Sequence, residues 1–213
     1  MKYLYLHGFL SGPDSGKGTF LDRKFRGLGK ELIRPDLNEG NFERMTISSQ
    51  LNLVEKILAD INDQVALIGS SLGGYLSLLL AERLPIVKKL GLIAPAFDFS
   101  ERYLNSMDPA VLSQWKKRGF IKLYHYGYQT EVKLAYGMAE DALRYQKYKT
   151  GRKIDCIMFH GINDEAVPYQ LSIEYLQRNP NTSLWLLNTD HGMLDKLEEL
   201  WQHLLPFLEF NSK

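Results

Sequence analysis

The segment VALIGSSLGGYLSLLLAERLP (residues 65–85) decides the fold class of this chain. Its first four residues are all apolar, which is typical of a strand that is covered by helices on both faces. The residues from 72 to 84 are predicted to form a helix that ends before Pro85, because proline cannot continue a helix. A strand, a glycine-bounded turn and a helix in direct succession predict an α/β unit built on a buried parallel sheet.

The same alternation continues on both sides of this segment. We therefore expect an α/β fold with a mostly parallel sheet of six to seven strands and helices on both faces. The strands are expected at 2–6, 31–35, 64–69, 88–93, 153–160 and 183–188, and the helices at 17–29, 46–61, 72–84, 168–178 and 194–208.

Residues 96–152 interrupt this alternation. They contain no clean β–α unit, but they are rich in tyrosine, and an alternating run at 120–126 before Gly127 favours a strand pair. We interpret 96–152 as a lid or cap inserted into a single domain that spans residues 1–213.

The composition limits the classes of partner. With 26 Lys and Arg against 25 Asp and Glu, the formal charge of +1 gives no attraction to nucleic acid or to an anionic membrane. The apolar run at 76–80 is far shorter than the roughly 20 residues that span a bilayer. The first six residues are also too short for the core of a signal peptide. The one cysteine, Cys156, lies in an apolar run and excludes an internal disulfide. We expect a cytoplasmic protein; its oligomeric state does not follow from the sequence.

The turn inside the opening segment carries a candidate nucleophile. Gly69 and Gly73 lie two residues before and after Ser71, and they allow the sharp backbone turn that exposes a serine hydroxyl at the end of a strand. Ser70 does not have such a pair of glycines. The alternative interpretation is a tight turn that needs only small residues.

A serine hydroxyl becomes a strong nucleophile when a histidine takes its proton and a carboxylate orients that histidine. Asp164 follows the predicted strand 153–160, and His191 follows the strand 183–188. The carboxyl ends of parallel strands meet at one edge, so both side chains are expected near Ser71. Asp98 and Glu165 remain alternatives for the acid.

The other histidines are less suitable as the base. His203 lies in a predicted helix, His125 lies in the insertion, and His160 ends a strand, where a structural role is expected. His7, in the loop after the first strand, is expected to stabilise that loop.

The backbone N–H groups of Phe9 and Leu72 are the candidates for an oxyanion hole, since one follows the first strand and the other follows the nucleophile. The next loop, GPDSGKGT (residues 12–19), is similar to a phosphate-binding loop. However, only three residues separate Gly12 from the Gly-Lys pair, and Gly18 follows Lys17 where Ser or Thr is required. We therefore expect no nucleoside triphosphatase (NTPase) function, no cofactor and no metal.

Together these motifs carry a family resemblance. The runs YLHGFLSGPDSGK (5–17), GSSLGG (69–74), HGxxDxxVP (160–168) and DHG (190–192) resemble the short bacterial YqiA-like esterases of the α/β-hydrolase superfamily. The resemblance implies the α/β-hydrolase fold and a cofactor-free esterase or thioesterase that acts on small acyl substrates. It also implies catalytic roles for Ser71, Asp164 and His191.

The hypothesis from the sequence is a serine hydrolase that forms an acyl-enzyme on Ser71. The alternatives are an inactive scaffold that serves as a binding module and a triad enzyme of another type, such as a peptidase, lyase or peroxidase.

Residues 97–152 contain ten Lys and Arg but six Asp and Glu. This excess predicts either a solvated lid surface, which we favour, or an anionic substrate that meets residues 116–118.

Overall fold

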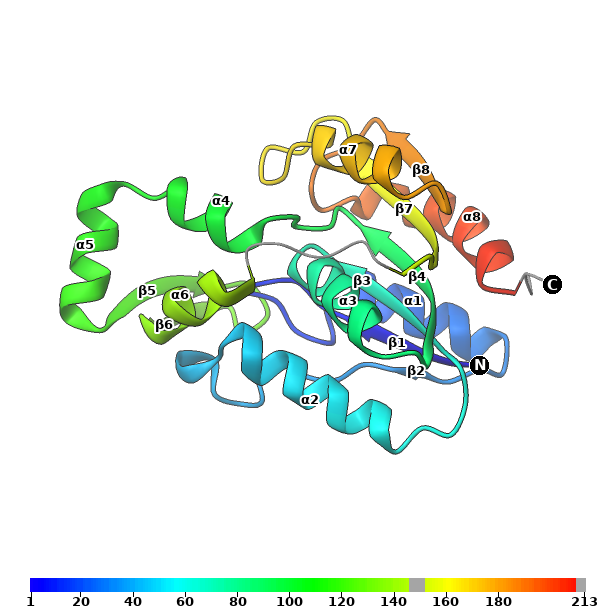
Figure 1. The fold of residues 1–213 in the computed structure, drawn as a ribbon, viewed down its shortest axis with the longest axis horizontal. Helices are drawn as coiled ribbons and strands as arrows, with labels where there is room; N and C mark the ends of the chain where they lie inside the picture. The colour runs from blue at the N-terminus through cyan, green and yellow to red at the C-terminus, as the bar shows by residue number, and fades with distance from the viewer. Residues whose placement is uncertain (146–151, 210–213) are drawn as a thin grey trace.

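A six-stranded parallel sheet forms the centre of the molecule in the computed structural model, which describes residues 1–145 and 152–209 (Figure 1). The strand order is β2-β1-β3-β4-β7-β8, and every neighbouring pair is parallel. The mostly parallel sheet is thus confirmed, with six strands. The bounds are β1 (Lys2–Leu6), β2 (Leu32–Ile33), β3 (Val65–Ser70), β4 (Val87–Ile93), β7 (Asp155–Gly161) and β8 (Thr182–Leu187).

Helices cover both faces of this sheet, because successive side chains of each strand point to opposite sides. In β1, Leu4 and Leu6 belong to one buried cluster and Tyr3 and Tyr5 to the other. The first cluster includes side chains of α2 (Ile47–Ala59), α3 (Leu72–Arg83) and α7 (Gln170–Arg178). The second includes side chains of α1 (Gly16–Gly27) and α8 (Leu197–Glu209). None of the helices within the described residues is long and apolar enough to cross a membrane.

We call the chain between β4 and β7 the β4–β7 segment (residues 94–154). Its residues 99–142 lie beyond the carboxyl ends of the sheet strands, at the left of Figure 1. Residues 146–151 of the predicted insertion lie outside the described residues. The segment contains α4 (Phe99–Asn105), α5 (Pro109–Arg118), β5 (Phe120–His125), β6 (Thr130–Ala135), α6 (Gly137–Ala142) and a 3-10 turn (Leu143–Tyr145).

Strands β5 and β6 form the expected strand pair, with β5 before Gly127 and β6 after it, and they are antiparallel. The tip of this hairpin reaches back to the loop after β1, where the Tyr126 N–H donates to the Leu10 carbonyl at 3.0 Å. The N–H of the buried Trp115 ring donates to the Leu134 carbonyl and fixes α5 on the hairpin.

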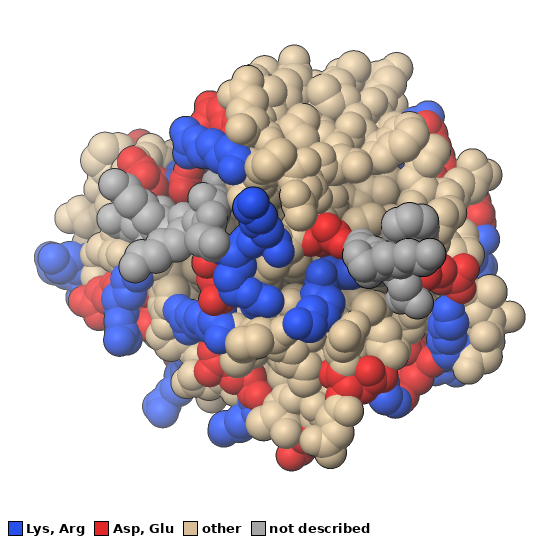
Figure 2. Space-filling view, turned by 45° about the vertical axis from the view of Figure 1, so that its right-hand side comes forward, with Lys and Arg blue, Asp and Glu red and all other residues tan. Residues whose placement is uncertain are grey.

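Charged side chains of both signs are interspersed on the face seen in Figure 2. This mixed surface agrees with the nearly balanced composition. The electrostatics of the site therefore depend on a few local groups and not on a field of one sign.

Candidate active site

Ser71 lies at the sharp turn between β3 and α3. Its backbone has φ 53° and ψ −119°, a left-handed conformation that costs roughly 1–3 kcal/mol for a residue other than glycine. The neighbouring strand holds this turn, because the Ser71 N–H donates to the Ile93 carbonyl at 2.9 Å. A β-carbon on Gly73 would collide with the carbonyls of Leu6 and His7, so only glycine allows α3 to start this close to β1.

The structure brings Ser71, Asp164 and His191 together. His191 Nε2 lies 3.1 Å from Ser71 Oγ, and His191 Nδ1 lies 2.6 Å from Asp164 Oδ2. An ionised carboxylate can only accept hydrogen bonds, so Nδ1 carries the proton. Nε2 is then free to accept the Ser71 hydroxyl proton, which is the arrangement that a general base needs.

Asp164 is held as a buried anion. Its side chain is fully buried, and Oδ1 accepts hydrogen bonds from the N–H groups of Ala166 and Val167 at 2.9 and 2.8 Å. Burial alone would raise the pKa of this carboxyl. Hydrogen bonds from His160 and His191, the charge of His191 and the Val167 N–H outweigh that effect and hold the pKa below its ordinary value. Asp164 therefore stays ionised at neutral pH.

His160 contacts the same carboxylate oxygen of Asp164 as His191 does. Its Nε2 lies 3.2 Å from Asp164 Oδ2 and 2.9 Å from the Val167 carbonyl, and its Nδ1 lies 2.6 Å from Ser172 Oγ. Both partners of Nε2 only accept, so Nε2 carries the proton and the Ser172 hydroxyl donates to Nδ1. The sequence reasoning assigned His160 a structural role and missed this contact. The sequence feature that could have revealed the contact is the spacing of four residues between His160 and Asp164, across the end of the strand.

The remaining candidates from the sequence lie elsewhere. Glu165 is exposed, and Asp98 is the residue that precedes α4. Neither of them is hydrogen-bonded to His191 within the described part of the chain. His203 stacks on Trp185 with ring centroids 3.6 Å apart, and His125 is buried in the β4–β7 segment.

The loop after β1 passes directly beside the nucleophile. A β-carbon built on Gly8 would lie 3.2 Å from Ser71 Cβ, so Gly8, the residue before Phe9, is packed against the nucleophile. Leu72 is the first residue of α3, so its N–H belongs to the unpaired first turn of that helix. The residue before Phe9 therefore lies against Ser71, and Leu72 directly follows Ser71.

His7 fixes this loop. The Leu37 N–H donates to His7 Nε2 at 3.0 Å, so the ring proton is on Nδ1, which donates to the Gly8 carbonyl at 2.9 Å. The carbonyl and the N–H of a trans peptide point in opposite directions. The bond to His7 therefore turns the Phe9 N–H away from the His7 ring. Burial lowers the pKa of His7, which keeps the ring neutral.

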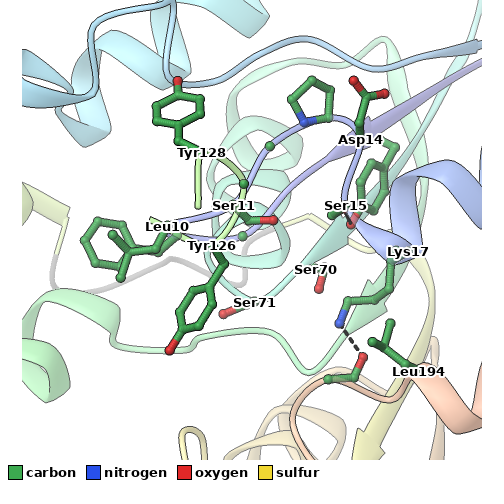
Figure 3. Close-up of a pocket in the computed structure, with 18 of the residues that line it drawn as sticks. Leu10, Ser11, Asp14, Ser15, Lys17, Ser70, Ser71, Tyr126, Tyr128 and Leu194 are labelled. Atoms are coloured by element: carbon green, nitrogen blue, oxygen red, sulfur yellow. Dashed lines mark hydrogen bonds between the residues drawn. The ribbon is translucent and has the colours of Figure 1, made fainter. Parts of the chain in front are cut away.

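A cavity of about 840 Å³ opens at Ser71 and His191. In Figure 3, Leu10 and Tyr126 lie on one side of Ser71, and Ser15 and Lys17 lie on the other. Lys116, Lys117 and Arg118 do not line it; they are exposed in the last turn of α5. No group of three His, Cys, Asp or Glu side chains suited to a metal ion occurs among the described residues.

Solved structures with the same architecture identify the fold. The structure of alpha/beta hydrolase domain-containing protein 10 from mouse aligns with a TM-score of 0.81 and 24% identity, over 98% of this chain and 89% of that one. A putative hydrolase from Agrobacterium vitis S4 aligns with a TM-score of 0.84 and 22% identity, over 98% and 88%. The fold is the α/β-hydrolase fold.

The family follows from the sequence itself. The model of the uncharacterised protein family UPF0227 matches residues 2–209, so the chain belongs to this family. A curated relative, the mitochondrial palmitoyl-protein thioesterase ABHD10 of Bos taurus, is 23% identical over 209 residues, which cover 92% of this chain and 68% of the relative.

Proposed function

We propose that this protein is a serine hydrolase that cleaves a carboxylic ester or thioester through an acyl-enzyme on Ser71. The observation that carries the proposal is the hydrogen-bonded chain from Ser71 through His191 to the buried Asp164 at the wall of a cavity. The curated relative named as a palmitoyl-protein thioesterase supports an acyl substrate.

In the first step His191 Nε2 takes the hydroxyl proton while Ser71 Oγ bonds to the carbonyl carbon. The carbonyl oxygen becomes an oxyanion, and the N–H groups of Phe9 and Leu72 stabilise it. The carbon–oxygen or carbon–sulfur bond of the leaving group then breaks, and His191 gives its proton to that group. Asp164 stabilises the charged His191 ring between these events.

In the second step His191 takes a proton from water, and the hydroxide bonds to the acyl carbon. The bond to Ser71 Oγ breaks, His191 returns the proton to the serine, and the carboxylic acid is released. We propose that the β4–β7 segment acts as the cap of a single domain, because residues 126–129 at its hairpin tip line the cavity with the loop after β1.

We also propose that the protein works in a reducing compartment such as the cytoplasm. The one cysteine, Cys156, is buried, and burial raises the pKa of its thiol, so it is an unreactive core residue. The Bos taurus relative is named as mitochondrial, so fractionation of cells that express the tagged chain decides between these locations.

Covalent labelling tests the proposed mechanism. A fluorophosphonate probe should label the native chain at Ser71, and p-nitrophenyl butyrate should be turned over. Ser71→Ala should abolish labelling and lower kcat by about 10⁴-fold or more. The control is Ser70→Ala at the neighbouring serine, which should still be labelled.

Absence of labelling and turnover in the folded native chain would contradict the proposal and favour the inactive scaffold. Labelling together with turnover of peptides but not of esters would favour a triad enzyme of another type.

A further inference from the structure

Lys17 places a positive charge in the cavity that the proposed mechanism does not use. It is the second residue of α1, and its Nζ donates to the Gly192 carbonyl at 2.6 Å (Figure 3). Lys17 is the one Lys or Arg among the described residues that line the cavity. Within the described part of the chain, no carboxylate lies within the 4 Å of an ion pair with it.

Holding a charged lysine at the wall of this cavity costs solvation free energy. An ammonium that leaves water loses solvation energy, and buried charges are usually paired for this reason. Burial accordingly lowers the pKa of Lys17 to about 8, although Asp190 and Asp164 attract its charge from a distance. An ammonium has three N–H bonds, and the contact with Gly192 uses one of them.

The nearby acids have other partners. Asp164 binds His191 and His160, and Asp190 Oδ1 accepts the Met193 N–H at 3.0 Å. Asp14 also lines the cavity, but its carboxylate lies 3.1 Å from the guanidinium of Arg34.

Asp36 lines the cavity too, and its Oδ1 accepts the Asn38 N–H and lies near His7. The cation at Lys17 is therefore not matched by a protein anion in contact with it.

Lys17 lies on the side of the site where the leaving group of the substrate is expected. Gly192, which Lys17 contacts, directly follows His191. In the proposed mechanism His191 gives its proton to the leaving group, so that group lies on the His191 side of Ser71. Leu10 and Tyr126 provide an apolar surface on the other side of Ser71 (Figure 3).

We propose that Lys17 is a specificity-determining residue that binds a carboxylate on the leaving group of the ester or thioester; this inference rests on the proposed function. The single ammonium matches the single negative charge of a carboxylate, whereas a phosphate dianion carries about two negative charges. The cation in the cavity is Lys17 in the first turn of α1, whereas residues 116–118 do not line the cavity.

A pair of matched esters tests this inference. The 3-carboxyphenyl and 3-carbamoylphenyl esters of butyric acid have similar shapes but differ in charge on the leaving group. In low salt the native enzyme should show a kcat/KM about 10- to 100-fold higher for the carboxylate ester, which corresponds to one charged hydrogen bond. Added salt should reduce this ratio.

Variants assign the preference to one side chain. Lys17→Met should bring the ratio of the two kcat/KM values close to one, and Lys17→Arg should retain part of the preference because it keeps the charge. A ratio within one variant is independent of how much active enzyme the preparation contains. The control is Lys116→Met on the exposed end of α5, which should leave the ratio unchanged.

Four results are distinguishable. A native ratio near one, with good turnover of both esters, overturns the role of Lys17 but not the proposed function. An unchanged preference in Lys17→Met also overturns it. If both esters lose the same factor in Lys17→Met and the native ratio is one, Lys17 only supports the His191 loop. No turnover of either ester, together with no labelling of Ser71, would instead contradict the proposed function.

Discussion

At the scale of single residues, the position of the ring proton of His7 fixes the orientation of the peptide that carries one proposed oxyanion donor. The ring has one acceptor nitrogen, used by the Leu37 N–H, and one donor nitrogen, used by the Gly8 carbonyl. The Gly8 carbonyl and the Phe9 N–H belong to the same peptide group. His7 therefore acts on the reaction through that peptide and not by contact with the substrate.

Two substitutions separate the two hydrogen bonds of His7. The Asn amide can reach the position of Nδ1 and donate to Gly8, whereas the longer Gln amide can reach the position of Nε2 and accept from Leu37. We expect His7→Gln to lower kcat for p-nitrophenyl butyrate by about 100-fold, which is the loss expected for one oxyanion donor. His7→Asn should retain most of kcat.

The affinity for a trifluoromethyl ketone inhibitor, which forms a tetrahedral adduct with Ser71, should fall with kcat in His7→Gln. Equal losses in both variants would contradict the orientation role.

Ser172 gives a prediction about stability at the same scale. Its hydroxyl donates to His160, which is fully buried behind Asp164. In Ser172→Ala the His160 Nδ1 would lose its donor inside the core. We expect the free energy of unfolding, measured with urea, to fall by about 1–3 kcal/mol. Ser183→Ala on the exposed side of β8 is the control and should change it by no more than about 0.5 kcal/mol.

At the scale of elements, the sequence predicts well where one periodicity extends over a whole segment. The fully buried β3 and the amphipathic α2 lie close to their expected ranges. Strand β2 is shorter than expected and pairs through only two residues. The helix expected at 194–208 begins with a 3-10 turn after Met193, whose φ of 52° interrupts the regular backbone.

The contacts within the site were harder to predict than its three central residues. The strand ends placed Asp164 and His191 near Ser71 through the topology alone. The contact between Lys17 and Gly192 joins chain positions far apart in sequence, and no local pattern encodes it. The short helices of the β4–β7 segment are fixed by tertiary bonds such as that of Trp115 to Leu134, so local propensity could not locate them.

The junction between β3 and α3 gives the prediction that belongs to this scale. In Gly73→Ala the new methyl group would meet the backbone of β1, which cannot move without disturbing the sheet. We expect a loss of about 3 kcal/mol or more in unfolding free energy, because overpacking against backbone is poorly relieved. Gly27→Ala at the end of α1 has open space around it and should be neutral or stabilising by up to about 1 kcal/mol. Similar denaturation midpoints for the two variants would contradict this account of the elbow.

At the scale of the whole molecule, two buried histidines lie in different parts of the fold, His7 in the loop after β1 and His125 in the β4–β7 segment. His125 is fully buried, its ring stacks on Tyr128, and its Nδ1 accepts the Tyr128 N–H at 3.0 Å. Burial lowers its pKa, and so does the charge of a protonated His7. Both rings are therefore neutral in the folded protein, one under the proposed oxyanion loop and one in the hairpin that covers the cavity.

These two rings predict how stability depends on pH. In the unfolded chain a histidine takes up a proton near pH 6.5. In the folded protein the pKa values of these two histidines are lower, so they take up a proton only at a lower pH. Unfolding therefore takes up protons below pH 6.5, and the free energy of unfolding should decrease as the pH falls from 7 to 5.5. Each proton taken up contributes at most about 1.4 kcal/mol per pH unit. Asp164 does not contribute in this range, because its lowered pKa keeps it ionised.

Urea denaturation at several pH values measures this slope, and variants attribute it to the two rings. His7→Asn and His125→Asn should each flatten the dependence between pH 7 and 5.5, and the double variant should nearly remove it. His203→Asn, at the ring that stacks on Trp185 on the outer strand, is the matched control and should leave the slope close to the native one. A native stability that rises toward pH 5.5 would show that neither ring is held neutral by the fold. The hydrogen-bond pattern assigned to His7, and with it the orientation of the Phe9 peptide, would then be wrong.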